Sequence, residues 1–243
     1  MRHLIAARNE VIVLSDFPDV FRGLAARVVG FRREHCDVIA HYAAFKAETR
    51  TNQWEDVCRS AKINVPFHFD DWQVRDRALV NEVRERAGQR PLVLVHGGRE
   101  PMGRTDRFGI ELLPERAAFA TALDALRRDC FLVQIGHGAK LYLLDTDWDL
   151  NGNTTVADLL DLASVCAGVV AQCSFCVPLA EAFDKPLLAI WASRGLRSAT
   201  PFIRQTTPQK VLSKTSSRFV RDDETAETIG ECARAFRDVL GSR

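Results

Sequence analysis

The chain has 243 residues, 47% hydrophobic and 27% charged, a composition that excludes disorder, a collagen-like repeat and a disulfide-stabilised mini-protein. Its 33 basic and 32 acidic residues leave a net charge of +1, so no overall field favours nucleic acid or a membrane surface. No run of about 18 apolar residues occurs, the first residues lack a signal-peptide core, and the seven cysteines lie scattered in apolar context, which together predict a cytoplasmic protein with reduced thiols.

The first 88 residues predict short elements separated by irregular stretches. Buried strands are predicted at residues 10–14 (EVIVL), 28–31 and 37–42. Helices are predicted at residues 19–26, 51–61 and 75–87, the last with an apolar stripe of Leu79, Val80 and Val83. Residues 64–72 (NVPFHFDDW) predict no regular structure.

From residue 91 onward, apolar strands alternate with amphipathic helices. The predicted strands are residues 91–95 (PLVLV), 130–135 (CFLVQI), 169–172 and 186–191 (PLLAIW). The predicted helices are residues 114–128, 155–165, 177–183 and 222–240, and residues 196–221 predict an extended loop. Uninterrupted apolar strands separated by helices are typical of a parallel sheet covered on both faces, so the predicted fold class is α/β.

Ligands of open parallel sheets bind outside the carboxyl ends of the strands, which makes the loops there the candidates for a site. The loop at residues 96–107 (HGGREPMGRTDR) begins with Gly97 and Gly98, which allow the backbone to approach a ligand closely. Arg99, Arg104 and Arg107 in the same loop suit an anionic group such as a diphosphate. The alternative is a solvated surface loop. The next such loop, GHGAK at residues 136–140, is a second candidate for a sugar or nucleotide.

The segment QCSFCVP at residues 172–178 joins a predicted strand to a predicted helix. Ser174 and the free amides of the helix start predict an anion site. Cys173 and Cys176 form a C-x-x-C at a helix N-terminus, where a thiol pKa falls, although both also suit packing. No second cysteine or histidine pair predicts a metal site. The alternating Asp145, Asp147 and Asp149 lack the glutamate that ends a calcium loop.

Four segments in this order resemble the C-terminal half of heptosyltransferase-like glycosyltransferases, the family 9 enzymes of GT-B fold: PLVLVHGG, LLPERAAFATAL, CFLVQIG and LNGNTTVADLLDLASVCAGVVAQCSFCVPLAEAFDKPLLAIWAS. The resemblance covers residues 90–195. Ser174, Ala180, Ala182 and Pro186 match the family pattern. The positions of Cys173, Phe175 and Pro178 depart from it, because the family tends to have Asp, Gly and His there.

The resemblance implies a GT-B-like protein in two parts. Residues 89–243 would form a Rossmann-like, nucleotide-sugar-binding C-terminal domain, and residues 1–88 an incomplete N-terminal Rossmann-like half on the acceptor side. The implied activity is sugar transfer from a nucleotide-sugar donor to an acceptor hydroxyl, with neither cofactor nor metal. The diphosphate would lie near residues 97–104 and 172–178, and the base and ribose near Gly136, residues 151–154 and Glu181. The implied substrate-binding residues are Gly97, Gly98, Arg99, Arg104, Gly136, Lys140, Asn151, Thr154, Ser174 and Glu181.

The beginning of the chain departs from that family. The family's enzymes open with a strand and a Gly-rich turn carrying the catalytic base, whereas residues 1–8 here resemble the end of the helix that follows. A truncated or naturally short chain that transfers sugar poorly is therefore expected, with Asp16 as a candidate base. The open strand edges of the N-terminal half would be covered by the final helix or by a second copy in a homodimer. Two other readings remain: a non-catalytic nucleotide-sugar-binding or partner protein, and a thiol redox protein centred on Cys173 and Cys176.

Overall fold

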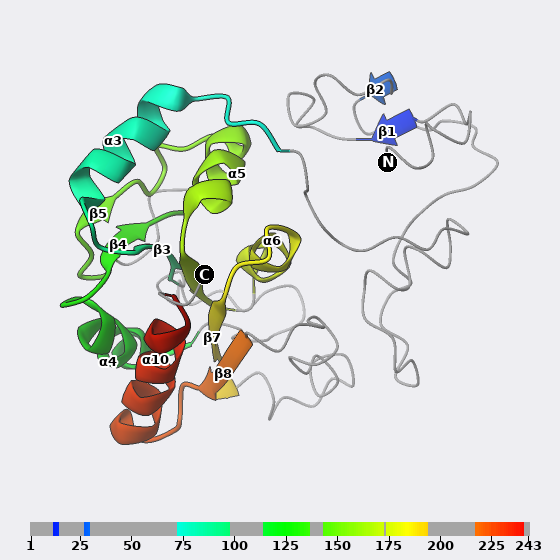
Figure 1. The fold of residues 1–243 in the computed structure, drawn as a ribbon. Coiled ribbons are helices and arrows are strands. Elements are labelled where there is room, and N and C mark those ends of the chain that lie inside the picture. Colours follow the sequence, from blue (N-terminus) through cyan, green and yellow to red (C-terminus); the bar gives the residue numbers. More distant parts are fainter. Residues whose placement is uncertain are drawn as a thin grey trace. The chain divides into compact units, whose positions relative to one another are not determined.

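The computed structural model describes residues 12–14, 27–29, 72–97, 114–136, 143–172, 174–193 and 217–240. The chain divides into two compact units. The first comprises Met1–Ala44 and Gln53–Pro66, and the second comprises Phe45–Asn52 and Phe67–Arg243. In the first unit, strand β1 (Ile12–Leu14) pairs in parallel with β2 (Arg27–Val29) (Figure 1). Both agree with predicted strands, while the predicted strand at 37–42 and the helices at 19–26 and 51–61 lie outside the described residues. The predicted division after residue 88 stays a prediction.

The second unit contains a parallel sheet of six strands in the order β5-β4-β3-β6-β7-β8. Its strands are β3 (Leu92–His96), β4 (Phe131–Gln134), β5 (Trp148–Asp149), β6 (Gly168–Gln172), β7 (Leu187–Trp191) and β8 (Ser217–Arg221). Counted from β3, the order is 3-2-1-4-5-6, that of the doubly wound Rossmann fold. The predicted α/β class with a Rossmann-like C-terminal sheet is therefore confirmed.

Helices cover both faces of this sheet (Figure 1). Helices α4 (Arg116–Leu126) and α10 (Ala226–Leu240) pack against each other on one face. The other face carries α5 (Val156–Val165) and α6 (Cys176–Ala182), and α3 (Arg77–Ala87) packs against α5. The crossovers on the two sides of β3 run in opposite directions, which sends their helices to opposite faces under the right-handed connection rule.

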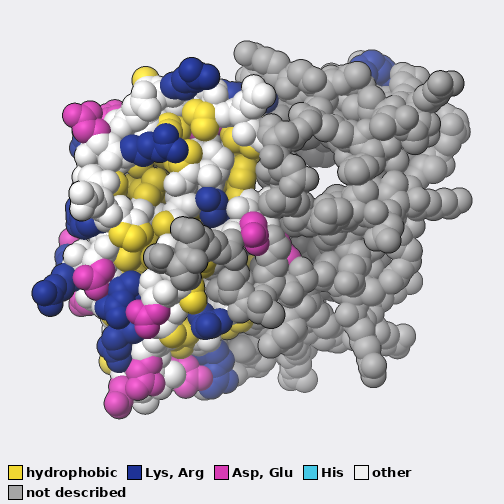
Figure 2. Space-filling model, in the orientation of Figure 1, with side chains coloured by type: hydrophobic (Ala, Val, Ile, Leu, Met, Phe, Trp, Pro, Cys, Tyr) yellow, Lys and Arg dark blue, Asp and Glu magenta, His cyan; other side chains and the backbone are white. Residues whose placement is uncertain are grey.

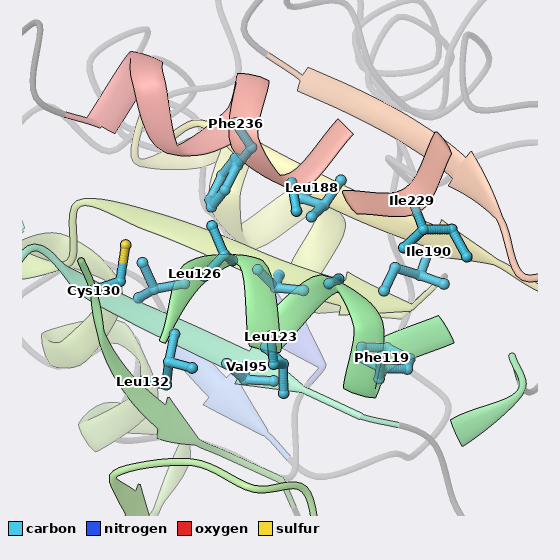
Figure 3. Packing of buried hydrophobic residues seen from close by; sticks show 14 of the residues in the cluster. Val95, Phe119, Leu123, Leu126, Cys130, Leu132, Leu188, Ile190, Ile229 and Phe236 are labelled. Atoms are coloured by element: carbon cyan, nitrogen blue, oxygen red, sulfur yellow. The ribbon is translucent and has the colours of Figure 1, made fainter. Parts of the chain in front are cut away.

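The core between α4, α10 and the sheet consists of closely packed aliphatic and aromatic side chains (Figure 3). Among its members are Val95, Phe119, Leu123, Leu126, Cys130, Leu132, Leu188, Ile190, Ile229 and Phe236. Helix α10 approaches β6 so closely that a Cβ added at Gly168 would lie 2.6 Å from Leu240 Cδ2 and 2.7 Å from Phe236 Cζ. The apolar face of the final helix thus belongs to this core. The expectation that this helix or a second copy covers strand edges of the N-terminal half stays a prediction.

Two predictions near the C-terminus were wrong. Residues 217–221, assigned to a loop, form strand β8, which pairs with β7 at the edge of the sheet as far as the structure describes it, and carries Arg218 and Arg221 in place of an apolar run. The last helix begins at Ala226 because Thr225 caps it, accepting a hydrogen bond from the Thr228 amide at 3.2 Å. Asp222, predicted to open that helix, lies in the turn before it.

The surface shows charges of both signs. On the face drawn in Figure 2, Lys and Arg side chains are interspersed with Asp and Glu, in keeping with the net charge of +1. Within the ranges that the structure describes, no helix is both long and apolar enough to span a bilayer.

Candidate functional site

The candidate site lies at the carboxyl ends of β3 and β6, the neighbouring strands at which the sheet order reverses. The chain leaves β3 toward α4 on one face and leaves β6 toward α6 on the other. Doubly wound folds bind their ligands at this topological switch point. The residues found there are His96 and the buried Gly97 at the end of β3, Gln172 at the end of β6, and Ser174 and Phe175 just after it.

His96 is a buried histidine without a full set of hydrogen bonds. Its side chain is 8% exposed, and its Nδ1 has no hydrogen-bond partner among the described residues. The ring meets the edge of the Phe175 ring, with the centroids 5.2 Å apart. Burial lowers the pKa of His96 to about 4, so the imidazole is neutral near pH 7. Since Val93 and Val95 belong to the core beneath α4 and α10, strand alternation places His96 on the α6 face.

Gln172 is the last residue of β6, as His96 is the last residue of β3. It is 7% exposed, and in the described part of the chain its Oε1 accepts no hydrogen bond. Val170 belongs to the core beneath α4 and α10, so Gln172, two residues later, lies on that face. Unsatisfied polar atoms thus flank the switch point from both faces. Leaving a buried polar atom unpaired costs about 1–3 kcal/mol, which makes such atoms candidates for ligand contacts.

The loop after β5 adds two more unpaired atoms. The amide of Leu150 donates to Gln134 O and that of Gly152 to Gly136 O, each at 2.9 Å, which brings this loop alongside the end of β4. Gly152 has φ +75°, a left-handed conformation that glycine adopts readily. Asn151 Oδ1 and Thr154 Oγ1 are buried and have no hydrogen-bond partner among the residues described.

Thr155, the next residue, is the N-cap of α5. Its Oγ1 accepts from the Asp158 amide at 3.2 Å, and its own amide donates to Asp158 Oδ2 at 2.7 Å. This reciprocal pair is a capping box that starts α5. The hydrogen bonds between the loop after β5 and the end of β4 bring three predicted site residues, Gly136, Asn151 and Thr154, to one end of the sheet.

The predicted residues of α6 are placed as follows. Ser174 Oγ accepts from the Cys176 amide at 3.3 Å and so caps the first turn of α6. Glu181 is buried, with 7% of its surface exposed. Cys176 is fully buried, and burial raises the pKa of its thiol, the opposite of the shift that a redox cysteine requires. Packing is therefore the favoured role of Cys176, while Cys173 lies outside the described residues.

The three alternating aspartates all hold structural contacts. Asp145 pairs with Arg127. Asp147 accepts from the Leu132 amide at 2.8 Å and pairs with Arg90 at 3.0 Å. Asp149 accepts from the Asn151 amide at 2.9 Å. Across the described ranges, no three His, Cys, Asp or Glu side chains are placed to hold a metal ion together.

Several predicted residues lie outside the described part of the chain and remain predictions. They are Asp16, Gly98, Arg99, Arg104, Arg107 and Lys140. Conversely, the sequence pattern did not single out His96 or Gln172 as site residues. The signal that was available is their position, since each is a polar residue that ends an apolar strand.

No protein-family model and no curated protein sequence matches the chain. Among solved structures, the iron-containing dodecameric glycosyltransferase TibC of enterotoxigenic E. coli is similar, with a TM-score of 0.57 and 10% identity over 99% of this chain and 70% of TibC. TibC in complex with ADP-D-β-D-heptose has a TM-score of 0.54 at 11% identity, covering 98% and 70% of the two chains.

Two further similar structures come from the same class of enzyme. A family 9 glycosyltransferase of Veillonella parvula has a TM-score of 0.51 and 11% identity over 96% of this chain and 68% of that one. ADP-heptose lipopolysaccharide heptosyltransferase II of E. coli has a TM-score of 0.45 and 17% identity over 73% and 56%. This chain thus spans 56–70% of the length of these proteins. The arrangement of its strands and helices is the fold of heptosyltransferase-like family 9 glycosyltransferases, the GT-B fold.

Proposed function

We propose that this chain binds a nucleotide-activated sugar at the carboxyl ends of β3, β6 and β5 and acts as a glycosyltransferase of the family 9 kind in the cytoplasm. The observation that carries the proposal is where unpaired polar atoms occur. The described residues contain five buried side-chain N or O atoms without a hydrogen-bond partner, and four of them, on His96, Gln172, Asn151 and Thr154, follow or end these strands. TibC, which shares the fold, was crystallised with ADP-D-β-D-heptose, a donor of this class.

The proposed contacts follow the chemistry of such a donor. Gly97, Gly98, Arg99 and Arg104 would hold the diphosphate, because paired glycines admit a ligand to the backbone and arginine binds phosphate in a bidentate manner. Asn151 and Thr154, beside Gly136, would bind the ribose or base, with Lys140, Ser174 and Glu181 as the further candidates. Arginine stabilises the charge that develops on a departing diphosphate, and an acceptor-side carboxylate such as Asp16 would deprotonate the acceptor hydroxyl.

The proposal is tested by thermal unfolding in the presence of millimolar UDP-, GDP-, ADP- and CDP-sugars. A ligand at a hundredfold excess over its Kd stabilises the native state by about 2.7 kcal/mol, which corresponds to a rise in Tm of about 5–10 °C for a chain of this size. Thr154→Val, which removes the hydroxyl at nearly constant shape, should weaken the binding of the responding ligand about fivefold. Asp124→Ala is the matched control, since Asp124 is 70% exposed on α4.

The outcomes separate three cases. No shift with any of the four donor classes would refute the proposal. Binding combined with slow release of nucleoside diphosphate that depends on a hydroxyl acceptor, with the sugar recovered on that acceptor, would identify an active transferase. Binding with no release in the presence of candidate hydroxyl acceptors would favour the non-catalytic nucleotide-sugar-binding protein.

A further inference from the structure

Residues 72–76, which precede α3 and are called the strap from here on, contact two helices that begin at the candidate site. The indole Nε1 of Trp72 donates a hydrogen bond to Asp161 Oδ1 on α5 at 2.8 Å. The ring of the same residue meets the ring of Phe183, the C-cap residue of α6, edge-on, with the centroids 6.4 Å apart. One side chain, Trp72, therefore contacts both α5 and α6.

The strap holds α5 in the second half of that helix. The amides of Arg75 and Asp76 donate to Asp161 Oδ2 at 2.9 and 2.7 Å. Residues 160–163 around this carboxylate are buried, whereas residues 156–159 in the first turn are only half-buried. The packing that fixes the direction of α5 thus lies where the strap contacts it. A helix of ten residues is about 15 Å long, so a small rotation at Asp161 displaces the first turn.

Both helices are joined to loops of the candidate site by short-range contacts. The capping box at Thr155 ties the N-cap to the first turn of α5, so Thr154, the residue before it, moves with that helix. On α6, Phe175 is the N-cap residue, and the Cys176 amide donates to Ser174 Oγ at 3.3 Å. The directions of α5 and α6 therefore set the places of Thr154 and Phe175 at the end of the sheet.

We propose that Trp72 is a positioning residue for the candidate site: by contacting α5 and α6 together it fixes the directions of both helices, and through them the places of Thr154 and Phe175. An indole suits this role because it combines a hydrogen-bond donor for the carboxylate with a large apolar ring. The effect on the two helices follows from the contacts described, while an effect on a bound ligand rests on the proposed function.

Hydrogen exchange of backbone amides, measured by NMR on the full chain, tests the effect on the helices. Trp72→Ala removes both contacts, so it should speed exchange in the first turns of α5 and α6 about fivefold, and by more than it speeds exchange in β3 and β4. Trp72→Phe keeps a ring but loses the donor, so it should act on the first turn of α5 alone. The reporting amides are those that are hydrogen-bonded in these turns: Asp158, Leu159, Val177 and Leu179.

Gly168→Ala is the matched control for a loss of stability that does not involve the strap. Its Cβ would lie 2.6 Å from Leu240 Cδ2, so it strains the second unit beneath α10 and should not preferentially speed exchange in the two first turns. Faster exchange confined to residues 72–79 in the Trp72 variants would overturn the positioning role. The same exchange pattern in Trp72→Ala and Gly168→Ala would overturn it as well. Trp72→Phe retains the aromatic ring and serves as the test where Trp72→Ala fails to fold.

The sugar nucleotide that responds in the thermal screen tests the effect on the site. Trp72→Phe should weaken its binding about threefold and Thr154→Val about fivefold. Because Trp72 acts through α5 and Thr154 in this proposal, the double variant should bind within about twofold of Thr154→Val alone. An unchanged affinity in Trp72→Phe, or a double-variant loss equal to the product of the single losses, would overturn this route. A native chain that binds none of the screened donors would remove the proposed function, while the exchange pattern would still decide whether Trp72 positions the helices.

Discussion

The buried carboxylate of Asp161 gives a stability prediction whose size follows from its contacts. Asp161 lies on α5, is 0% exposed and accepts three hydrogen bonds. The donors are Trp72 Nε1 at 2.8 Å, the Arg75 amide at 2.9 Å and the Asp76 amide at 2.7 Å. They belong to the segment that enters α3, so a single carboxylate fastens that segment to α5. We predict that Asp161→Ala destabilises the folded chain strongly.

The magnitude comes from the three donors left behind. Each donor that loses its acceptor costs about 1–3 kcal/mol when fully buried, and these three are partly buried, so water recovers some of that loss. A loss near the lower end for each gives about 3–4 kcal/mol in total, or a fall in Tm of about 6–15 °C. Asp161→Asn should be nearly as damaging, because its amide NH₂ would point a donor at the existing donors.

Urea unfolding followed by circular dichroism and by tryptophan fluorescence measures this change, the second probe being sensitive to Trp72. Asp124→Ala is the control, because its carboxylate is 70% exposed and its ion pair with Arg127 is worth at most about 0.5 kcal/mol. A loss below about 1 kcal/mol in Asp161→Ala would refute the reasoning. It would mean that residues 72–76 contribute little to the stability of the second unit.

Two further predictions concern His96 and Gly168. Because burial holds the pKa of His96 near 4 in the folded chain, against about 6.5 when unfolded, only the unfolded chain takes up this proton as the pH falls from 6.5 to 4. The free energy of unfolding should therefore drop by about 3 kcal/mol more in the native protein than in His96→Phe over that range, and identical urea-denaturation profiles would disprove it. Gly168→Ala should cost about 1–3 kcal/mol, since its Cβ would lie 2.6 Å from Leu240 Cδ2. Gly230→Ala, whose Cβ meets only the end of the Arg234 side chain at 3.3 Å, should gain up to about 1 kcal/mol in the same thermal assay, and equal effects of the two would contradict the packing described.

The parts of the fold that the sequence predicts are those whose signal is local. Strands β3, β6 and β7 are buried on both faces, so they appear as apolar runs in the sequence. Strand β8 has no such signal, because it carries Arg218 and Arg221 and lies at the edge of the described sheet, where it pairs with β7. Strand β5 has two residues, Trp148 and Asp149, too few for any periodicity.

The candidate site also has residues that the sequence indicates and residues that only the structure reveals. The rule that ligands bind at carboxyl strand ends identifies the loops at residues 96–107, 136–140 and 172–178 from the apolar strand pattern. Asn151 and Thr154, which follow the two-residue strand β5, were implied only by the family resemblance. That rule does not distinguish a ligand contact from a hydrogen bond within the chain: Ser174, predicted as an anion contact, also accepts from the Cys176 amide. Burial together with a missing partner marks His96 and Gln172, and both properties exist only in three dimensions.

The buried polar atoms without a hydrogen-bond partner at the strand ends differ in charge from the buried polar groups that are paired. The buried carboxylates of Asp161 and Asp222 are satisfied internally: Asp161 accepts three hydrogen bonds, and Asp222 accepts from the Glu115 amide at 2.9 Å and the Ser193 amide at 2.7 Å. The unpaired atoms at the strand ends instead belong to neutral groups, a glutamine, an asparagine, a threonine and a histidine whose pKa burial has lowered. An unpaired buried charge costs far more than an unpaired neutral dipole, so neutral groups are the ones that can stay unpaired at the strand ends before a ligand binds. Under the proposed function, the positive charge that a diphosphate needs would come from other side chains, for which Arg99, Arg104 and Arg107 are the candidates in the sequence.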